Sequence, residues 1–150
     1  MAQAIELAIG NVRRGAGGPF AALVVRGGIV LASGTNQVTA LNDPTAHAEV
    51  VAIRGACQAA RNFQLNDCDL YTTCEPCPMC MGAIYWARLA RVYYASTRDD
   101  AAGLGFDDSL IYDQLRLRPG QRTVNMIQTM RDEALEAFRE WEKSPTKVKY

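Results

Sequence analysis

The distribution of histidine and cysteine along the chain constrains the fold more than any other feature of the sequence. His47 is the single histidine, and Cys77 and Cys80 follow about thirty residues later, with both groups at the expected start of a helix. These side chains can bind one ion only if the fold brings the two helix starts together. Cys74, Cys77 and Cys80 lie within seven residues, and the chain has five cysteines in total. This clustering and the odd number indicate a metal or redox site rather than a disulfide framework.

Length and composition indicate one globular domain and exclude several classes of protein. The 150 residues are 49% apolar and 21% charged, which excludes an intrinsically disordered chain. Sixteen basic and sixteen acidic residues cancel, which argues against nucleic acid or an anionic membrane as the main partner. No apolar run is long enough to span a bilayer, and residues 1–14 lack the basic start and cleavage site of a signal peptide. We therefore expect a cytoplasmic protein without a membrane partner.

Apolar periodicity and turn residues predict alternating helices and strands in a single domain over residues 1–150. Asp43-Pro44 is interpreted as the N-cap and first residue of the second helix. A hairpin followed by strands that alternate with helices predicts the α/β class, with a mixed five-stranded sheet between two helix layers in a three-layer α-β-α sandwich. Helices are expected at residues 2–14, 44–60, 78–88, 109–117 and 132–143, strands at 20–26, 29–32, 69–73, 91–96 and 124–128, and loops at 33–42 and 97–107.

The histidine and the Cys77-x-x-Cys80 pair have the donor chemistry of a zinc site. The two thiolates flank the start of a helix, where the exposed N–H groups and the helix dipole favour the deprotonated thiol. One imidazole and two thiolates suit Zn²⁺ and leave a fourth position for water, whose pKa zinc would lower to about 7. We therefore predict one zinc ion per chain, bound by His47, Cys77 and Cys80.

Two neighbouring residues decide whether such a site is catalytic or structural. Glu49 lies two positions after His47, so the two side chains cannot share a lateral helix face, but both can reach a site beyond the end of the helix. Cys74 could instead be a fourth protein ligand that closes the site and leaves no water to activate. Pro76 favours extended chain before it and is expected to carry Cys74 away from the ion. An open site with Glu49 beside it is the preferred interpretation.

Longer stretches of the sequence resemble a known family. His47-Ala48-Glu49 followed by Pro76-Cys77-x-x-Cys80 is the signature of zinc nucleobase deaminases. The chain resembles the cytidine deaminase-like superfamily and, within it, the bacterial guanine deaminases most closely. This narrower resemblance covers nearly the whole chain and rests on residues 17–20, 42–49, 74–88 and 105–109 and on the terminal Lys149-Tyr150.

The resemblance implies a cytidine deaminase-like fold and a hydrolysis of guanine. Guanine and water would give xanthine and ammonia, as in purine catabolism or salvage, with attack at C2 of the base. His47, Cys77 and Cys80 would bind zinc. Glu49 would be the catalytic residue, taking a proton from the attacking water, passing it to a ring nitrogen and later protonating the leaving amine.

The resemblance also assigns substrate-binding residues. Asp108 would accept hydrogen bonds from adjacent N–H donors of guanine, and Asn36, whose amide is both donor and acceptor, would read another edge. Phe20 and Trp86 would stack on the ring or enclose it. From the residues alone, Asp108 equally fits the cap of the following helix, and Phe20 and Trp86 equally fit the core.

The role of the C-terminal tail comes from the resemblance alone. In relatives this segment, at about residues 130–150 here, is exchanged between two subunits. The chain is therefore expected to be a homodimer in which Tyr150 closes the site of the second copy and contacts the base. Without the resemblance, the last seven residues would be interpreted as a frayed tail.

Three other functions stay open on the sequence alone. A tRNA adenosine deaminase shares the motif but needs a basic surface around its pocket, whereas this chain is neutral and has lysine only in its last eight residues. Deamination of another heterocycle, such as cytosine, an aminotriazine or a pterin, also fits, because the motif does not fix the ring size. The third is a non-catalytic binding protein with a structural zinc site, which has no use for Glu49.

Overall fold

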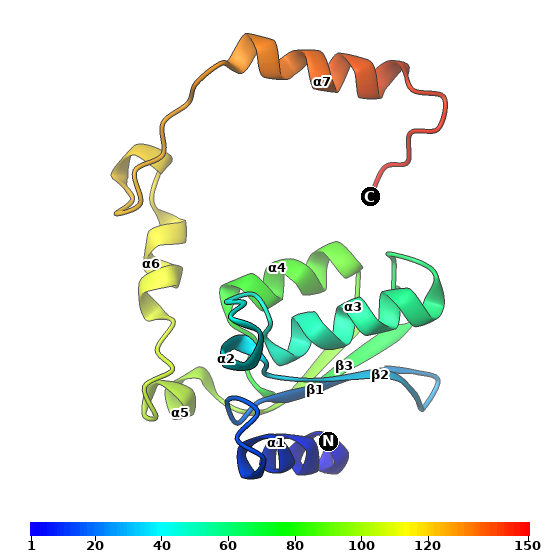
Figure 1. Cartoon of the computed structure of the whole chain (residues 1–150), viewed down its shortest axis with the longest axis vertical. Helices are drawn as coiled ribbons and strands as arrows, with labels where there is room; N and C mark the ends of the chain where they lie inside the picture. Colours follow the sequence, from blue (N-terminus) through cyan, green and yellow to red (C-terminus); the bar gives the residue numbers. More distant parts are fainter. The chain divides into compact units, whose positions relative to one another are not determined.

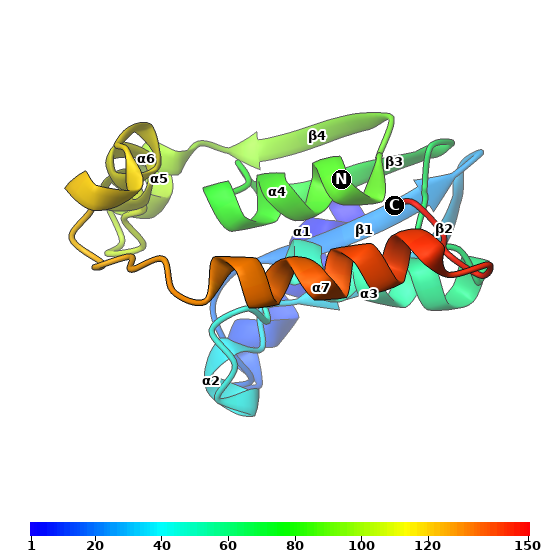
Figure 2. The ribbon, with the colours of Figure 1, turned by 90° about the horizontal axis from the view of Figure 1, so that it is seen from above.

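A mixed sheet of four strands forms the centre of the first part of the chain. The computed structural model describes all residues 1–150, which group into two compact units, Met1–Asp108 and Ser109–Tyr150. The sheet belongs to the first unit, and Figure 2 shows β4 at its edge, beside β3. β1 pairs antiparallel with β2 and β3, whereas β3 and β4 are parallel. In the spatial order β2-β1-β3-β4, the strands are β2 (Ile29–Thr35), β1 (Ala21–Arg26), β3 (Cys68–Cys74) and β4 (Arg91–Ser96).

Helices cover both faces of this sheet (Figure 1). α1 (Ala2–Arg13) packs against β1 and β3 on one face, and α3 (Ala48–Ala60) and α4 (Pro78–Ala87) lie together on the other. The three-layer α-β-α arrangement predicted from the sequence is thereby confirmed. The main core lies between the sheet and the latter two helices, and its fully or almost fully buried side chains include Val24, Leu70, Ala52, Ile53 and Ile84. None of the helices is both long enough and apolar enough to cross a membrane.

The second unit is helical. It contains α6 (Ser109–Arg116), the short 3-10 helix η1 (Pro119–Gln121) and α7 (Arg131–Lys143), so the two helices predicted there are confirmed. The fifth strand predicted at 124–128 is wrong, because those residues belong to no helix or strand. A strand needs the backbone of a neighbouring strand for its hydrogen bonds, and this unit contains no other strand.

The prediction that residues 33–42 and 97–107 are plain loops is also wrong. β2 continues to Thr35, and the short helices α2 (Val38–Leu41) and α5 (Arg98–Ala102) follow β2 and β4. α5 begins with a capping box, in which the Thr97 hydroxyl accepts from Asp100 N and the Asp100 carboxylate accepts from Thr97 N. That reciprocal pair stabilises a first turn too short to be predicted from apolar periodicity.

The helix that follows Asp43 begins later than predicted, and the difference matters for the site. The Asp43 carboxylate accepts hydrogen bonds from the backbone N–H of Thr45 at 2.8 Å and from its hydroxyl at 2.7 Å. This local turn uses the cap that was expected to open the helix. α3 therefore starts at Ala48, with His47 as its N-cap in extended conformation (φ −67°, ψ 152°).

β2 and α3 approach each other closely at Gly34. A Cβ atom at this position would lie 2.3 Å from the carbonyl oxygen of Ala48 and 2.6 Å from the backbone nitrogen of Ala52. Both atoms belong to the helix backbone, which cannot move aside as a flexible side chain can. Glycine at this position therefore allows the first turns of α3 to rest on the sheet.

We predict that Gly34→Ala destabilises the protein, because the added methyl group must push α3 off the sheet. The free energy of unfolding should fall by at least about 1–3 kcal/mol, the usual cost of overpacking. Gly82→Ala is the matched control, because nothing lies within 4 Å of a Cβ at that position in α4. Alanine there should be neutral or stabilise the helix by up to about 1 kcal/mol. Urea denaturation of both variants measures the difference, and equal stabilities would contradict the close approach.

Candidate metal centre

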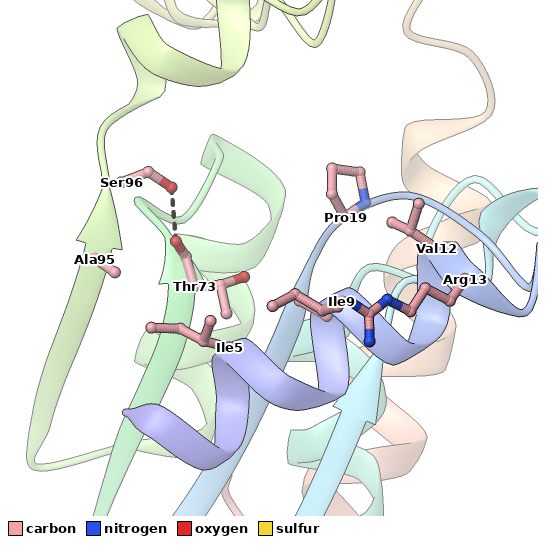
Figure 3. Close-up of a pocket in the computed structure, with 9 residues that line it drawn as sticks. Ile5, Ile9, Val12, Arg13, Pro19, Thr73, Ala95 and Ser96 are labelled. Atoms are coloured by element: carbon pink, nitrogen blue, oxygen red, sulfur yellow. Dashed lines mark hydrogen bonds between the residues drawn. The ribbon is translucent and has the colours of Figure 1, made fainter.

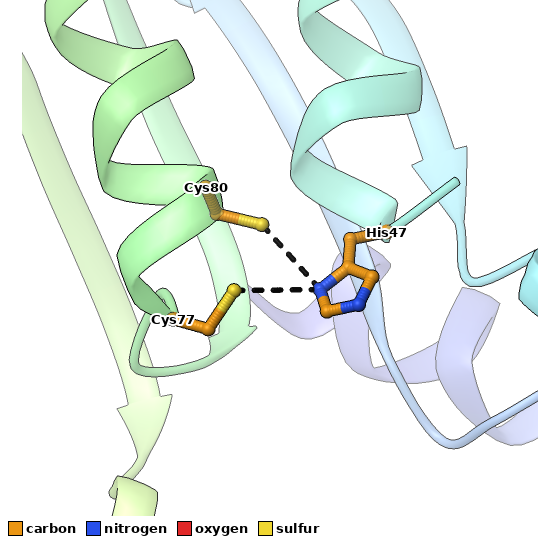
Figure 4. A group of neighbouring side chains, drawn as sticks. All are labelled: His47, Cys77 and Cys80. Carbon is orange, nitrogen blue, oxygen red and sulfur yellow. Dashed lines mark hydrogen bonds between the residues drawn. The ribbon is translucent and has the colours of Figure 1, made fainter. Parts of the chain in front are cut away.

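The starts of α3 and α4 bring three metal donors together. His47 is the N-cap of α3, and Cys77 is the N-cap of α4 with an equally extended backbone (φ −65°, ψ 169°). Pro78 occupies the first turn of α4, where its missing N–H costs no hydrogen bond. Cys80 follows in the same turn, so its thiol and that of Cys77 point from one helix end towards the imidazole (Figure 4).

The distances between these donors fit a zinc ion. The Nδ1 atom of His47 lies 3.6 Å from the Sγ atom of Cys77 and 3.6 Å from that of Cys80. All three ligand atoms lie within 4.8 Å of one another. A tetrahedral zinc ion with bonds of about 2.0–2.1 Å to nitrogen and about 2.3 Å to sulfur separates such donors by about 3.5 Å. The residues present therefore suit zinc, with Nδ1 as the imidazole donor.

The electrostatics of the cluster favour a thiolate at Cys77. A hydrogen bond from the Cys80 thiol, assisted by His47, lowers the pKa of Cys77 to about 4. The same hydrogen bond, together with burial, raises the pKa of Cys80. The pKa of His47 is raised, chiefly by its hydrogen bond to Cys77. Without a cation, the three donors thus share protons, and a bound metal ion would take the place of those protons.

Glu49 lies beside the donors and is almost completely buried. One carboxylate oxygen is 3.5 Å from the Cys80 thiol, and the other accepts a hydrogen bond from the Thr72 hydroxyl at 3.3 Å. Burial is the main cause of its raised pKa. His47 is the N-cap and lies outside the regular helix, so its side chain is not on the opposite lateral face from Glu49. Thr72 was not found from the sequence, since its role depends on which face of β3 meets α3.

Cys74 is placed apart from the three donors. It ends β3, it is buried, and its thiol donates a hydrogen bond to the carbonyl oxygen of Thr97 at 3.5 Å. The group of side chains able to hold a metal ion consists of His47, Cys77 and Cys80 alone. The geometry therefore favours the open site over the closed one that Cys74 would complete.

Phe20 and Asp108 are predicted substrate-binding residues of the first unit, which also contains the metal donors. Burial, followed by the negative charge of Cys77, raises the pKa of Asp108. Phe20 is half-buried and packs edge-on against Phe106, with ring centroids 4.9 Å apart. Phe106 lies in the stretch 105–109 but is not among the predicted site residues, and the structure gives it a contact with one of them.

Asn36 lies just after β2 and is held by backbone groups. Its side-chain oxygen accepts from Gly18 N at 3.4 Å and from Val38 N at 3.3 Å. These bonds orient the amide with its oxygen towards the backbone, so its NH₂ group is the part left for a ligand. The sequence had suggested an amide that both donates and accepts, and the structure reduces it to a donor.

Trp86 and Tyr150 are the remaining predicted substrate-binding residues. Trp86 lies near the end of α4, with 65% of its surface exposed, so the interpretation of this side chain as core is wrong. Tyr150 is the last residue of the second unit and is 72% exposed there.

An apolar pocket of about 540 Å³ lies in the first unit between α1 and the strands β3 and β4 (Figure 3). Ile5 and Ile9 extend into it from α1, with Thr73, Ala95 and Ser96 opposite them. It holds none of the metal donors. The sequence did not predict this pocket. Ile5, Ile9 and Val12 recur at the spacing of an amphipathic helix, whose apolar side is normally buried, yet each is at least 41% exposed.

A buried carboxylate beside one imidazole and two thiolates, on an α/β sandwich, is typical of a zinc-dependent hydrolase. Residues 1–96 match the family described as the cytidine and deoxycytidylate deaminase zinc-binding region, and the chain belongs to this family. It is 50% identical to guanine deaminase of Bacillus subtilis (strain 168) over 148 residues, which cover 99% of this chain and 95% of that protein. An X-ray structure of guanine deaminase from the same species superimposes with a TM-score of 0.96.

Two further relatives show how far the likeness extends. A structure of guanine deaminase from Nitrosomonas europaea has a TM-score of 0.68 and 34% identity, and the match covers 71% of this chain and 62% of that one. A tRNA-specific adenosine deaminase of Agrobacterium fabrum is 47% identical over 78 residues, which cover 52% of this chain and 51% of that protein. The likeness to the B. subtilis protein thus includes the C-terminal unit, whereas the adenosine deaminase match covers about half of this chain.

We predict that Cys80→Ser abolishes stoichiometric zinc binding, because serine replaces a thiolate that is one of three donors. Cys74→Ser and Cys57→Ser are the controls, and both should keep about one zinc per chain. Plasma emission spectrometry of the purified proteins measures the metal, with circular dichroism as the check on folding. Loss of zinc in Cys74→Ser would instead establish a fourth protein ligand.

Proposed function

We propose that this protein is an enzyme that hydrolyses guanine to xanthine and ammonia. The observation that carries this proposal is a buried Glu49 carboxylate beside three metal donors, one fewer than a closed tetrahedral zinc site has. Relatives named guanine deaminase, one of them similar over nearly the whole chain, support guanine as the substrate.

The residues at the cluster have the chemistry that this hydrolysis needs. His47, Cys77 and Cys80 would hold zinc, which would lower the pKa of a water molecule and so make a nucleophile available at neutral pH. Glu49 accepts a proton from the water that attacks C2 of guanine and delivers it to a ring nitrogen. It then carries the second proton of the water to the departing amino group, which leaves as ammonia. Burial raises the pKa of Glu49, which makes its carboxylate a stronger base for the proton that it must accept.

The substrate would be read by complementary hydrogen bonds. Asn36 offers an NH₂ donor group, which suits an acceptor on the purine ring or its O6 atom. Asp108, whose ionised carboxylate is an acceptor, suits the adjacent N–H donors of guanine. Phe20, held by Phe106, and the exposed Trp86 supply aromatic surfaces for the ring.

We further propose that the protein is a homodimer in which residues from about 130 to 150, ending in Tyr150, are exchanged. Both units leave apolar surface exposed: Phe138 and Trp141 are exposed on α7, and the pocket beside α1 is lined largely by apolar side chains. Exposed apolar side chains on a helix and an apolar pocket are both features of subunit interfaces. An exchanged tail would place Tyr150 over the site of the second copy.

The cytoplasm is the compartment we propose for this protein. All five cysteines are free, and Cys77 and Cys80 must stay reduced to bind zinc. A reducing compartment keeps them in that state.

Ammonia release from guanine, cytosine and an adenosine-bearing RNA hairpin tests the reaction. We expect the zinc-loaded protein to act on guanine, and Glu49→Ala to lower kcat by at least about 10²–10⁴-fold, because a positioned acid and base is removed. The variant should keep its zinc, since Glu49 is not a donor. Turnover of another base in place of guanine would refute the substrate, and full activity of zinc-loaded Glu49→Ala would refute the mechanism.

Mixing two inactive variants tests the exchange of the tail. Deletion of residues 147–150 and the full-length Glu49→Ala variant should each be nearly inactive alone. After they are denatured and refolded together, the intact tail of the Glu49→Ala chain would close the intact site of the truncated chain. About a quarter to a half of wild-type activity per active site is then expected. A mixture as inactive as its components would show that each tail serves its own chain.

A further inference from the structure

Asn11 is a polar residue in an otherwise apolar stripe of α1. It follows Ala4 and Ala8 at helical spacing, and all three are buried, with Asn11 only 1% exposed. Burying a side-chain amide is unfavourable unless it forms hydrogen bonds. An apolar side chain at this position would complete the stripe, so the amide needs a specific reason.

Both hydrogens of the Asn11 amide are donated to backbone carbonyl groups, one on each of two chain segments. Its Nδ2 atom donates to the carbonyl oxygen of Gly18 at 3.0 Å and to that of Asn36 at 2.9 Å. Gly17 makes this close approach possible, because a Cβ there would lie 2.1 Å from the Asn36 oxygen and 3.1 Å from Asn11 Nδ2. Asn11 therefore joins two chain segments, before β1 and after β2, from within the core.

Both polar backbone groups of Asn36 form hydrogen bonds. Its backbone N–H donates to the Phe20 carbonyl at 3.0 Å, and its backbone carbonyl accepts from Asn11. Gly18, which Asn11 holds by its carbonyl, donates its own N–H to the side-chain oxygen of Asn36. Asn11 thus acts on Asn36 in two ways, directly through the backbone and through Gly18.

We propose that Asn11 is a positioning residue for substrate recognition, which fixes Asn36 so that its NH₂ group faces the base. The inference rests on the proposed role of Asn36 in binding guanine. Asn11 itself is buried against the two segments that contain Gly18 and Asn36, and it needs no contact with the substrate. If it is removed, the Asn36 amide gains freedom to turn, and the NH₂ group is no longer held for the acceptor on the base.

A double-mutant cycle on the zinc-loaded, full-length enzyme tests this role. Asn11→Leu keeps the size of the side chain and removes both donors. It should raise KM for guanine about tenfold or more, with kcat changed less than about threefold and zinc content unchanged. In the Asn36→Ala background, the same substitution should change KM less than about twofold, because its effect passes through Asn36.

Ala8→Gly controls for a general loss of stability in α1. It removes a buried methyl group from the same side of the helix and changes none of the hydrogen bonds of Asn11. It should lower Tm while leaving KM unchanged. Asn11→Ser replaces Asn11→Leu if the latter does not fold, with the same criteria.

Each of the following results would overturn the inference. Asn11 variants could leave KM unchanged, Ala8→Gly could raise KM as much as they do, or the effects of Asn11→Leu and Asn36→Ala on KM could simply multiply. An unchanged KM in Asn36→Ala would also overturn it, by removing the role on which it rests. Guanine turnover by the wild-type enzyme would still stand in that case, so the two proposals fail separately.

Discussion

The structure depends on the N-termini of α3 and α4, which lie next to each other. Each helix start carries roughly half a positive charge, so two of them side by side repel unless negative groups lie close to them. The Cys77 thiolate and the Glu49 carboxylate are such groups, and both belong to the helix ends that they neutralise. The tight packing of Gly34 under α3 keeps one of these ends in place. The negative groups of the site therefore also stabilise the packing of the two helices.

Most of the fold and the metal donors could be predicted from local signals in the sequence. Helices and strands follow apolar periodicity, and a lone histidine with a Cys-x-x-Cys pair is a distinctive donor set. The strand predicted at 124–128 failed because β-rich composition cannot show whether a pairing partner exists. The predicted start of the second helix was wrong for a different reason. The Asp43 carboxylate forms a local turn with Thr45, and such a turn uses the same residue type as a helix cap.

Contacts between distant segments could not be predicted in the same way. Thr72 reaches Glu49 across 23 positions of sequence, and Asn11 reaches Asn36 across 25. Nothing in the composition of either segment signals these pairs, because they arise only when β3 meets α3 and α1 meets the loops. They are hydrogen bonds behind the site, and they set which atoms of Glu49 and Asn36 remain available to a substrate.

The metal donors also come from segments that only the folded chain brings together. In the unfolded chain, Cys77 and Cys80 remain neighbours, but His47 is far from them, so the denatured ensemble retains only part of the zinc affinity. Most of the binding free energy therefore appears as resistance to unfolding. A partly loaded sample consequently contains two populations with distinct melting temperatures, and the zinc concentration during purification sets their proportions.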